Sequence, residues 1–122
     1  MHTVYLSIII PCFNEESSIP LFYDEIIAVL KFVNEQIEFI FVDDGSKDNT
    51  LNILRELGGK DSRVHYVSFS HNFGKEAAML AGLQTAQGKY VVILDADLQH
   101  PPSMIPKMLE TGYKRKIRLH CG

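Results

Sequence analysis

Four short runs of almost continuous apolar residues recur along the chain. Each run is followed by a polar segment and then by a segment whose apolar residues recur at the spacing of a helix. The runs are Val4–Pro11, Phe39–Val42, Val64–Phe69 and Tyr90–Leu94. Unbroken apolar runs of this length are typical of strands in a sheet that is covered on both faces. Because strands that alternate with helices form parallel sheets with right-handed crossovers, the pattern predicts an α/β fold. We expect a Rossmann-like, mostly parallel sheet with flanking helices.

The intervening segments carry apolar residues at helical spacing, with cap residues before them and glycine or proline at their ends. We expect helices from Ser17 or Ser18 to about Asn34, from Asp48 or Thr50 to Gly58-Gly59, around Ala77 to near Gly88, and around Met104–Leu109 after Pro101-Pro102.

Polar residues gather at the carboxyl ends of the predicted strands, which is the edge where open α/β sheets bind ligands. Carboxylates brought this close repel one another unless a cation lies among them. Carboxylate and amide oxygens suit Mg²⁺ or Mn²⁺, which bind through one or two carboxylates together with substrate phosphates. The pattern therefore predicts a metal-dependent site for a phosphorylated ligand. The side chains that form it are expected to include Asn14, Glu15, Asp43, Asp44, Asp95 and Asp97.

Taken singly, these strings have structural interpretations. The segment 43–46 has residue types that are typical of turns and helix caps. Lys75 is interpreted as the exposed first residue of a helix, and Cys12 as a small buried apolar side chain. It is their joint placement at strand ends that favours a functional site. No G-x-G-x-x-G, P-loop or Gly-x-Ser-x-Gly string occurs, which disfavours the usual dinucleotide fold, a P-loop enzyme and a serine hydrolase.

Composition excludes several other classes. The chain has 122 residues and a net charge of −3, and its last nine residues hold four of the twelve basic side chains and no acid. The rest is acidic, so we expect no nucleic-acid partner. Two cysteines make no disulfide framework, and no apolar run has the length of a membrane helix. The first residues lack the basic start of a signal peptide, so we expect a cytoplasmic protein.

Several strings together resemble one enzyme family. The segments 9–16, 41–50 and 95–97 look like those of the inverting glycosyltransferase family 2, which has the GT-A fold. The segment 71–78 with Gly82, and the segment 95–102, resemble its dolichol-phosphate mannosyltransferase and bactoprenol glucosyltransferase branch. The resemblance extends from residue 4 to about residue 110.

The resemblance implies roles for individual residues. The nucleotide would contact residues after the first predicted strand, and its base would lie at the carboxyl end of the second. The ribose and diphosphate would lie along the residues that follow the fourth. Asp97 would ligate Mg²⁺ or Mn²⁺, with Gln99 as a further oxygen ligand, and no general base is assigned. The nucleotide-sugar-binding residues would be Pro11, Phe13, Glu15, Val42, Asp44, Asp95 and Ala96.

The reaction implied is transfer of a sugar from a UDP- or GDP-linked donor with inversion at C1. A phosphate monoester has a second pKa near ~6 and is largely ionised at neutral pH, so it attacks without a general base. Polyprenyl phosphate is therefore a chemically sensible acceptor, and the branch resemblance favours it. Such an acceptor would place the protein at the periphery of a membrane.

The resemblance stops before the chain does. We expect residues 1–113 to be the nucleotide-sugar-binding part of a GT-A domain and residues 114–122 to be a non-matching basic tail. We interpret the chain as truncated and inactive alone, with exposed apolar surface that favours a homodimer. A short basic tail on a complete small domain is the alternative.

Three other functions are open at this stage. A non-catalytic nucleotide-sugar binding module would bind the donor without transferring the sugar. A phosphatase with an aspartyl nucleophile also uses Asp95-x-Asp97, although that motif then follows the first strand. A receiver-like signalling domain would use Asp43-Asp44 and would leave the other strand ends unexplained.

Overall fold

The computed structural model describes residues 3–97 of the chain. It contains four parallel strands, β1 (Leu6–Cys12), β2 (Ile37–Asp43), β3 (Val64–Ser68) and β4 (Tyr90–Ile93), which lie in the order β3-β2-β1-β4. Three helices connect them: α1 (Ser18–Leu30), α2 (Thr50–Lys60) and α3 (Lys75–Thr85). The predicted α/β fold with a parallel sheet is confirmed. The predicted helix around residues 104–109 lies outside the described residues.

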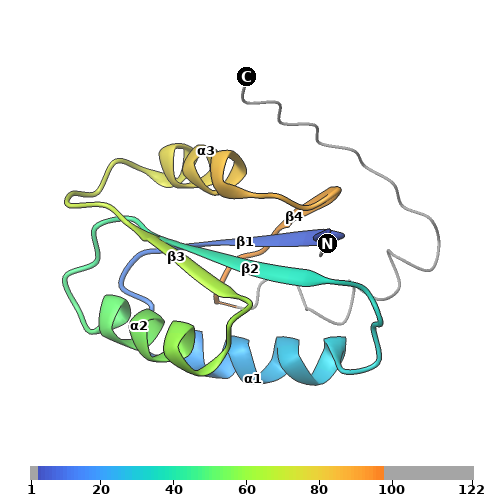
Figure 1. Cartoon of the computed structure of the whole chain (residues 1–122). Helices are drawn as coiled ribbons and strands as arrows, with labels where there is room; N and C mark the ends of the chain where they lie inside the picture. The colour runs from blue at the N-terminus through green and yellow to red at the C-terminus, as the bar shows by residue number, and fades with distance from the viewer. Residues whose placement is uncertain (1–2, 98–122) are drawn as a thin grey trace.

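The sheet is the middle of three layers, with α1 and α2 on one face and α3 on the other (Figure 1). Successive side chains of a strand point to opposite faces, so β1 contributes side chains to two separate hydrophobic clusters. Ile8 and Ile10 belong to the cluster under α1 and α2, whereas Ile9 belongs to the cluster under α3. Burial on both faces explains why the strand sequences are apolar without alternation.

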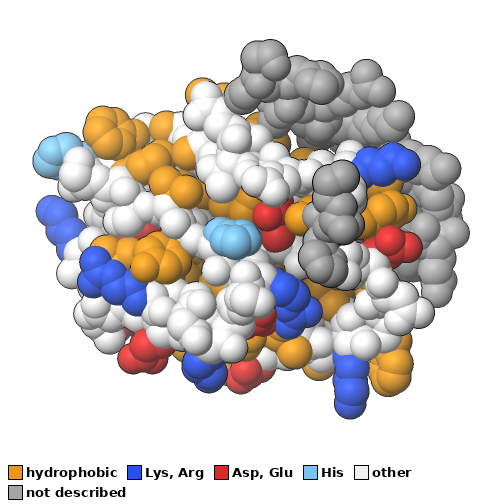
Figure 2. Space-filling model, viewed as in Figure 1, with side chains coloured by type: hydrophobic (Ala, Val, Ile, Leu, Met, Phe, Trp, Pro, Cys, Tyr) orange, Lys and Arg blue, Asp and Glu red, His pale blue; other side chains and the backbone are white. Residues whose placement is uncertain are grey.

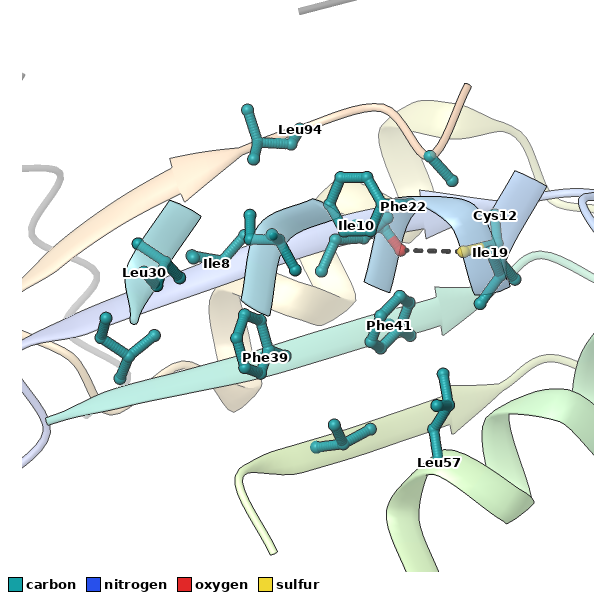
Figure 3. Packing of buried hydrophobic residues seen from close by; sticks show 14 of the residues in the cluster. Ile8, Ile10, Cys12, Ile19, Phe22, Leu30, Phe39, Phe41, Leu57 and Leu94 are labelled. Atoms are coloured by element: carbon teal, nitrogen blue, oxygen red, sulfur yellow. Dashed lines mark hydrogen bonds between the residues drawn. The ribbon is translucent and has the colours of Figure 1, made fainter. Parts of the chain in front are cut away.

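Aromatic and aliphatic side chains fill the larger cluster (Figure 3). Phe22 of α1 meets Phe41 of β2 edge to face, with 6.2 Å between the ring centroids. Cys12 is also buried here, and its thiol donates a hydrogen bond to the carbonyl oxygen of Ile10, which the dashed line in Figure 3 marks. The interpretation of Cys12 as a small core side chain is therefore confirmed.

A buried polar network closes the amino-terminal edge of the sheet. The Ser7 hydroxyl donates to the Glu38 carboxylate and accepts a hydrogen bond from the amide of Gly88 at 2.8 Å. Glu38 also accepts from the amide of Gln87 at 2.8 Å and lies 3.7 Å from the His65 ring nitrogen. The network thus ties the segment before β4 to the starts of β1 and β2.

Helix ends depart from the expected positions. The first helix ends at Leu30 instead of near Asn34, because the chain turns there and the amide of Val33 donates to the carbonyl of Leu30. The third ends at Thr85, three residues before Gly88.

The second helix was expected to stop at Gly58-Gly59, and this was wrong, because α2 continues to Lys60. Gly58 lies under β3, where an added Cβ would come 3.3 Å from the Tyr66 ring. At this position the absence of a side chain leaves room for the Tyr66 ring of β3.

Figure 2 shows the face along β3, where charged side chains of both signs are most frequent over α1 and α2 and hydrophobic side chains remain visible above them. Within residues 3–97, no helix has the length and apolar character needed to cross a membrane.

Candidate nucleotide and metal site

The connections that follow β1, β2 and β3 lie together at one edge of the sheet, on the left of Figure 1. In the described part of the chain this edge holds a pocket of about 250 Å³. Carboxylates dominate its polar lining, and one lysine accompanies them. The lining residues are Pro11, Cys12, Phe13, Glu15, Asp44, Lys75, Ala78, Asp95, Ala96 and Asp97.

Most residues expected at the site share this pocket. Val42 does not line it, because its side chain is fully buried in the cluster under α3. Gln99 lies outside the described residues. Three lining residues had no predicted contact, namely Cys12, Lys75 and Ala78. Lys75 and Ala78 belong to the 71–78 string, which resembles the family and runs into the start of α3, so this string could have indicated them.

Asn14 and Asp43 were expected among the ligand-facing groups, but neither lines the pocket. The Asp43 carboxylate accepts a hydrogen bond from the amide of Ser46 at 3.0 Å and so forms the turn after β2. Asn14 has a φ of 52°, accepts from the amide of Lys47 at 2.8 Å, and donates its own amide to the Ser46 hydroxyl at 2.8 Å. Both residues stabilise the loops next to the pocket, as the structural interpretation of 43–46 predicts for Asp43.

The same interlocking continues in the segments that lead into α1 and α2. The amide of Glu15 donates to the Thr50 hydroxyl at 2.9 Å, and the amide of Glu16 donates to the Asp48 carboxylate at 3.2 Å. The loops after β1 and β2 are therefore held to each other by side-chain to backbone hydrogen bonds. This fixes the backbone from which Glu15 reaches the pocket.

Asp44 anchors the β3–α3 loop, which comprises residues 69–74. Its carboxylate accepts hydrogen bonds from the amide of Phe73 at 2.8 Å, from the amide of Gly74 at 3.0 Å and from the Asn72 side-chain amide at 3.2 Å. Asp44 is 5% exposed, so these partners compensate a nearly buried carboxylate. Sequence reasoning did not foresee this link, because it joins residues about thirty positions apart.

Lys75 is the first residue of α3 and forms an ion pair inside the pocket. Its ammonium nitrogen lies 2.8 Å from the Asp95 Oδ1 atom. The Lys75 side chain is 59% exposed and that of Asp95 is 23% exposed. Lys75 therefore begins its helix as expected and, in addition, neutralises a carboxylate of the site.

Cys12 is not available as a nucleophile. Burial, and secondarily the neighbouring Asp43 and Glu15 carboxylates, raise the pKa of its thiol well above the usual value. Because the thiolate is the reactive form, a thiol held protonated is inert.

The chemistry of the lining fits a hard divalent cation. Asp95 and Asp97 present carboxylates to an open pocket, and Mg²⁺ and Mn²⁺ take one or two such ligands together with phosphate oxygens and water. Among the described residues no preassembled group of three or more His, Cys, Asp or Glu side chains is found.

Comparison with solved structures defines the class of fold. A mannosyltransferase from Pyrobaculum calidifontis, PcManGT, solved in complex with GDP-Man and Mn²⁺, superposes with a TM-score of 0.68 at 27% identity over 80% of this chain and 28% of that chain. Staphylococcus aureus TarS 1–349 in complex with UDP gives a TM-score of 0.74 at 24% identity over 88% of this chain and 31% of its own. The fold is the α/β fold of GT-A glycosyltransferases.

Sequence comparison then gives the family. The model of glycosyl transferase family 2 matches residues 7–116, and the chain belongs to this family. The bactoprenol glucosyl transferase of Shigella phage SfV is 42% identical over 105 residues, which are 86% of this chain and 34% of that protein. The chain thus spans about a third of the length of the curated relatives that it matches.

Proposed function

We propose that this chain supplies the donor-binding part of a metal-dependent, inverting glycosyltransferase that takes a UDP- or GDP-linked sugar. The observation that carries the proposal is the pocket at the carboxyl edge of the sheet, where Glu15, Asp44, Asp95 and Asp97 meet in a member of family 2. A relative named for bactoprenol and a structural neighbour that binds GDP-Man and Mn²⁺ support it.

In this proposal different residues of the pocket contact different parts of the donor. Pro11, Phe13 and Glu15 lie along the nucleoside, and Asp44 accepts from the base through the lone pair that the β3–α3 loop does not use. Asp95 and Ala96 lie along the ribose and diphosphate.

Asp97 holds Mg²⁺ or Mn²⁺, together with Gln99. When bound, the metal neutralises the diphosphate and stabilises the charge that develops on the leaving nucleotide.

The proposed acceptor is polyprenyl phosphate. An ionised oxygen of its phosphate attacks C1 of the sugar from the face opposite the diphosphate, the C1–O bond to the diphosphate breaks, and the nucleoside diphosphate leaves. The configuration at C1 is inverted. No protein base is required, because the acceptor oxygen is already ionised at neutral pH. We further propose that the protein acts at the cytoplasmic surface of a membrane, where such an acceptor is presented.

A thermal-shift panel tests donor binding, with UDP, GDP and CDP each offered with Mg²⁺, with Mn²⁺ and without metal. A nucleotide at 100 times its dissociation constant stabilises a protein by about 2.7 kcal/mol, which raises the midpoint by several degrees. We expect one nucleotide to produce a metal-dependent shift, and Asp97→Asn to remove the part that depends on metal. Asp24→Asn, on the exposed surface of α1, is the matched control and is expected to behave like the wild type.

Transfer is assayed separately with the nucleotide sugar that binds and a short polyprenyl phosphate. Transfer of the sugar with inversion supports the enzymatic proposal. Binding without transfer or donor hydrolysis would instead indicate a non-catalytic nucleotide-sugar binding module. No metal-dependent shift with any of the three nucleotides would refute the donor site.

A further inference from the structure

The pocket has a marked imbalance of charge. Its lining carries four carboxylates, those of Glu15, Asp44, Asp95 and Asp97, and within the described residues Lys75 is the one basic side chain among them. A diphosphate that enters such a pocket meets repulsion unless cations lie between the phosphate oxygens and the carboxylates. The placement of this lysine therefore bears directly on how an anionic ligand binds.

The backbone beneath Lys75 is held firmly. Asp44 accepts three hydrogen bonds from the β3–α3 loop, and two of them come from the amides of Phe73 and Gly74, which directly precede Lys75. The loop also packs against Gly45, where an added Cβ would lie 2.4 Å from the carbonyl carbon of His71. The Cα atom of Lys75 is thus fixed relative to the end of β2.

The head of the same side chain is not enclosed. The Lys75 side chain is 59% exposed, and its partner Asp95 is 23% exposed. An ion pair with this exposure contributes little to folding stability, so it is readily exchanged for another partner. A lysine ammonium on a four-carbon stem can turn from one anion to a neighbouring one without moving the backbone.

We propose that Lys75 is a second cation of the donor site, which exchanges its partner when the donor binds. In the donor-free protein its ammonium group neutralises Asp95. With the nucleotide and its divalent metal bound, Asp97 would hold the metal, and the ammonium group of Lys75 would turn from Asp95 to a diphosphate oxygen. This inference rests on the proposed function, and it assigns to Lys75 a contact with the diphosphate.

The exchange predicts opposite effects of one substitution on two ligands. Lys75→Met keeps an unbranched side chain that lacks only the position of the ammonium group, and it removes the charge. Loss of a charge-assisted hydrogen bond should weaken binding of UDP or GDP in the presence of Mn²⁺ by about tenfold to a hundredfold. Binding of Mn²⁺ alone should become tighter by about two- to fivefold, because no ammonium group then offsets the negative charge of Asp95 in the same pocket.

Both affinities are measured on the full chain, by titration calorimetry for the nucleotide and by electron paramagnetic resonance of free Mn²⁺ for the metal. Lys75→Arg restores the charge and is expected to recover most of the nucleotide affinity. Lys89→Met is the matched control, because Lys89 is exposed and precedes β4 at the opposite edge of the sheet. It should change neither affinity. Thermal unfolding of each variant verifies that it is folded.

The outcomes distinguish failure of the donor site from failure of the role of Lys75. If the wild-type chain binds neither UDP nor GDP with Mn²⁺, the proposed function and this inference both fail. If the wild type binds a nucleotide and Lys75→Met binds it equally well, the donor site stands and the role of Lys75 is overturned. The role is also overturned if Lys75→Met weakens Mn²⁺ and nucleotide binding together, because that result indicates a merely structural contribution.

Discussion

Gly45 lies where the loop after β2 is crossed by the β3–α3 loop, and replacing it with alanine tests this crossing. Its φ is +73°, which costs a residue with a side chain about 1–2 kcal/mol. The added Cβ would also lie 2.4 Å from the carbonyl carbon of His71 and 2.5 Å from the amide nitrogen of Asn72. Because these are backbone atoms, the loop must shift, at a further cost of about 1–3 kcal/mol. Gly45→Ala should therefore lower the free energy of unfolding by about 2–5 kcal/mol.

Two other glycines separate these contributions. Gly74 has a φ of +102° but nothing within 4 Å of an added Cβ, so Gly74→Ala carries only the backbone penalty of about 1–3 kcal/mol. Gly59 lies in α2 with open space around it, so Gly59→Ala should stabilise the protein by about 0.5–1 kcal/mol. The expected order of stability is thus Gly59→Ala, wild type, Gly74→Ala and Gly45→Ala.

Urea unfolding followed by circular dichroism measures this series. With a urea dependence of about 1–3 kcal/mol per molar, the Gly45→Ala midpoint should fall by about 1 M or more. The slope should be unchanged, since adding one methyl group hardly alters the surface that is exposed on unfolding. A Gly45→Ala loss no greater than that of Gly74→Ala would refute the close approach of the two loops, and with it the rigid placement of Lys75.

Two further predictions concern pH and the buried polar network. Hydrogen bonds from Arg63 hold the pKa of Asp61 at about 2 instead of 3.8, so this carboxylate stabilises the native state fully above about pH 4 and loses its contribution as pH falls through 2. Asp61→Asn should cost about 1–2 kcal/mol at pH 7 and almost nothing at pH 2, and a difference that does not vary with pH in urea unfolding would contradict this. Ser7→Ala should cost about 1–3 kcal/mol, because it removes a partner from both Glu38 and Gly88. Hydrogen exchange should show the Gly88 amide exchanging faster, and unchanged protection would count against the network.

The strands were predictable because their burial is a property of the local sequence. Runs such as Phe39–Val42 have no periodicity because both faces of the sheet are covered, and this composition alone separates them from the amphipathic helices. The end of α2 was not predictable from the two glycines, because Gly58 lies inside the helix and close to the ring of Tyr66 in the next strand, which would have to shift to admit a side chain. Local glycine statistics favour a helix end, and the tertiary contact overrides them.

The site was predictable as far as the strand ends determine it. The carboxyl ends of parallel strands meet at one edge, which brings Glu15, Asp44 and Asp97 into one pocket. Val42 precedes the end of β2, and the alternation of side chains turns it into the cluster under α3. The ion pair between Lys75 and Asp95 depends on a side-chain conformation across twenty residues of sequence, which no local pattern contains.

The order of the strands has a consequence during synthesis of the chain. Among the strands of residues 3–97, β1 is synthesised before the others, and it pairs with β2 on one side but with β4 on the other. A nascent chain that has completed β3 can assemble three strands, with one edge of the apolar β1 still bare. At a synthesis rate of about 5–20 residues per second, the stretch from Ser68 to Ile93 leaves that edge open for roughly one to five seconds. During this interval the bare edge of β1 can pair with a strand of a neighbouring nascent chain on the same polysome.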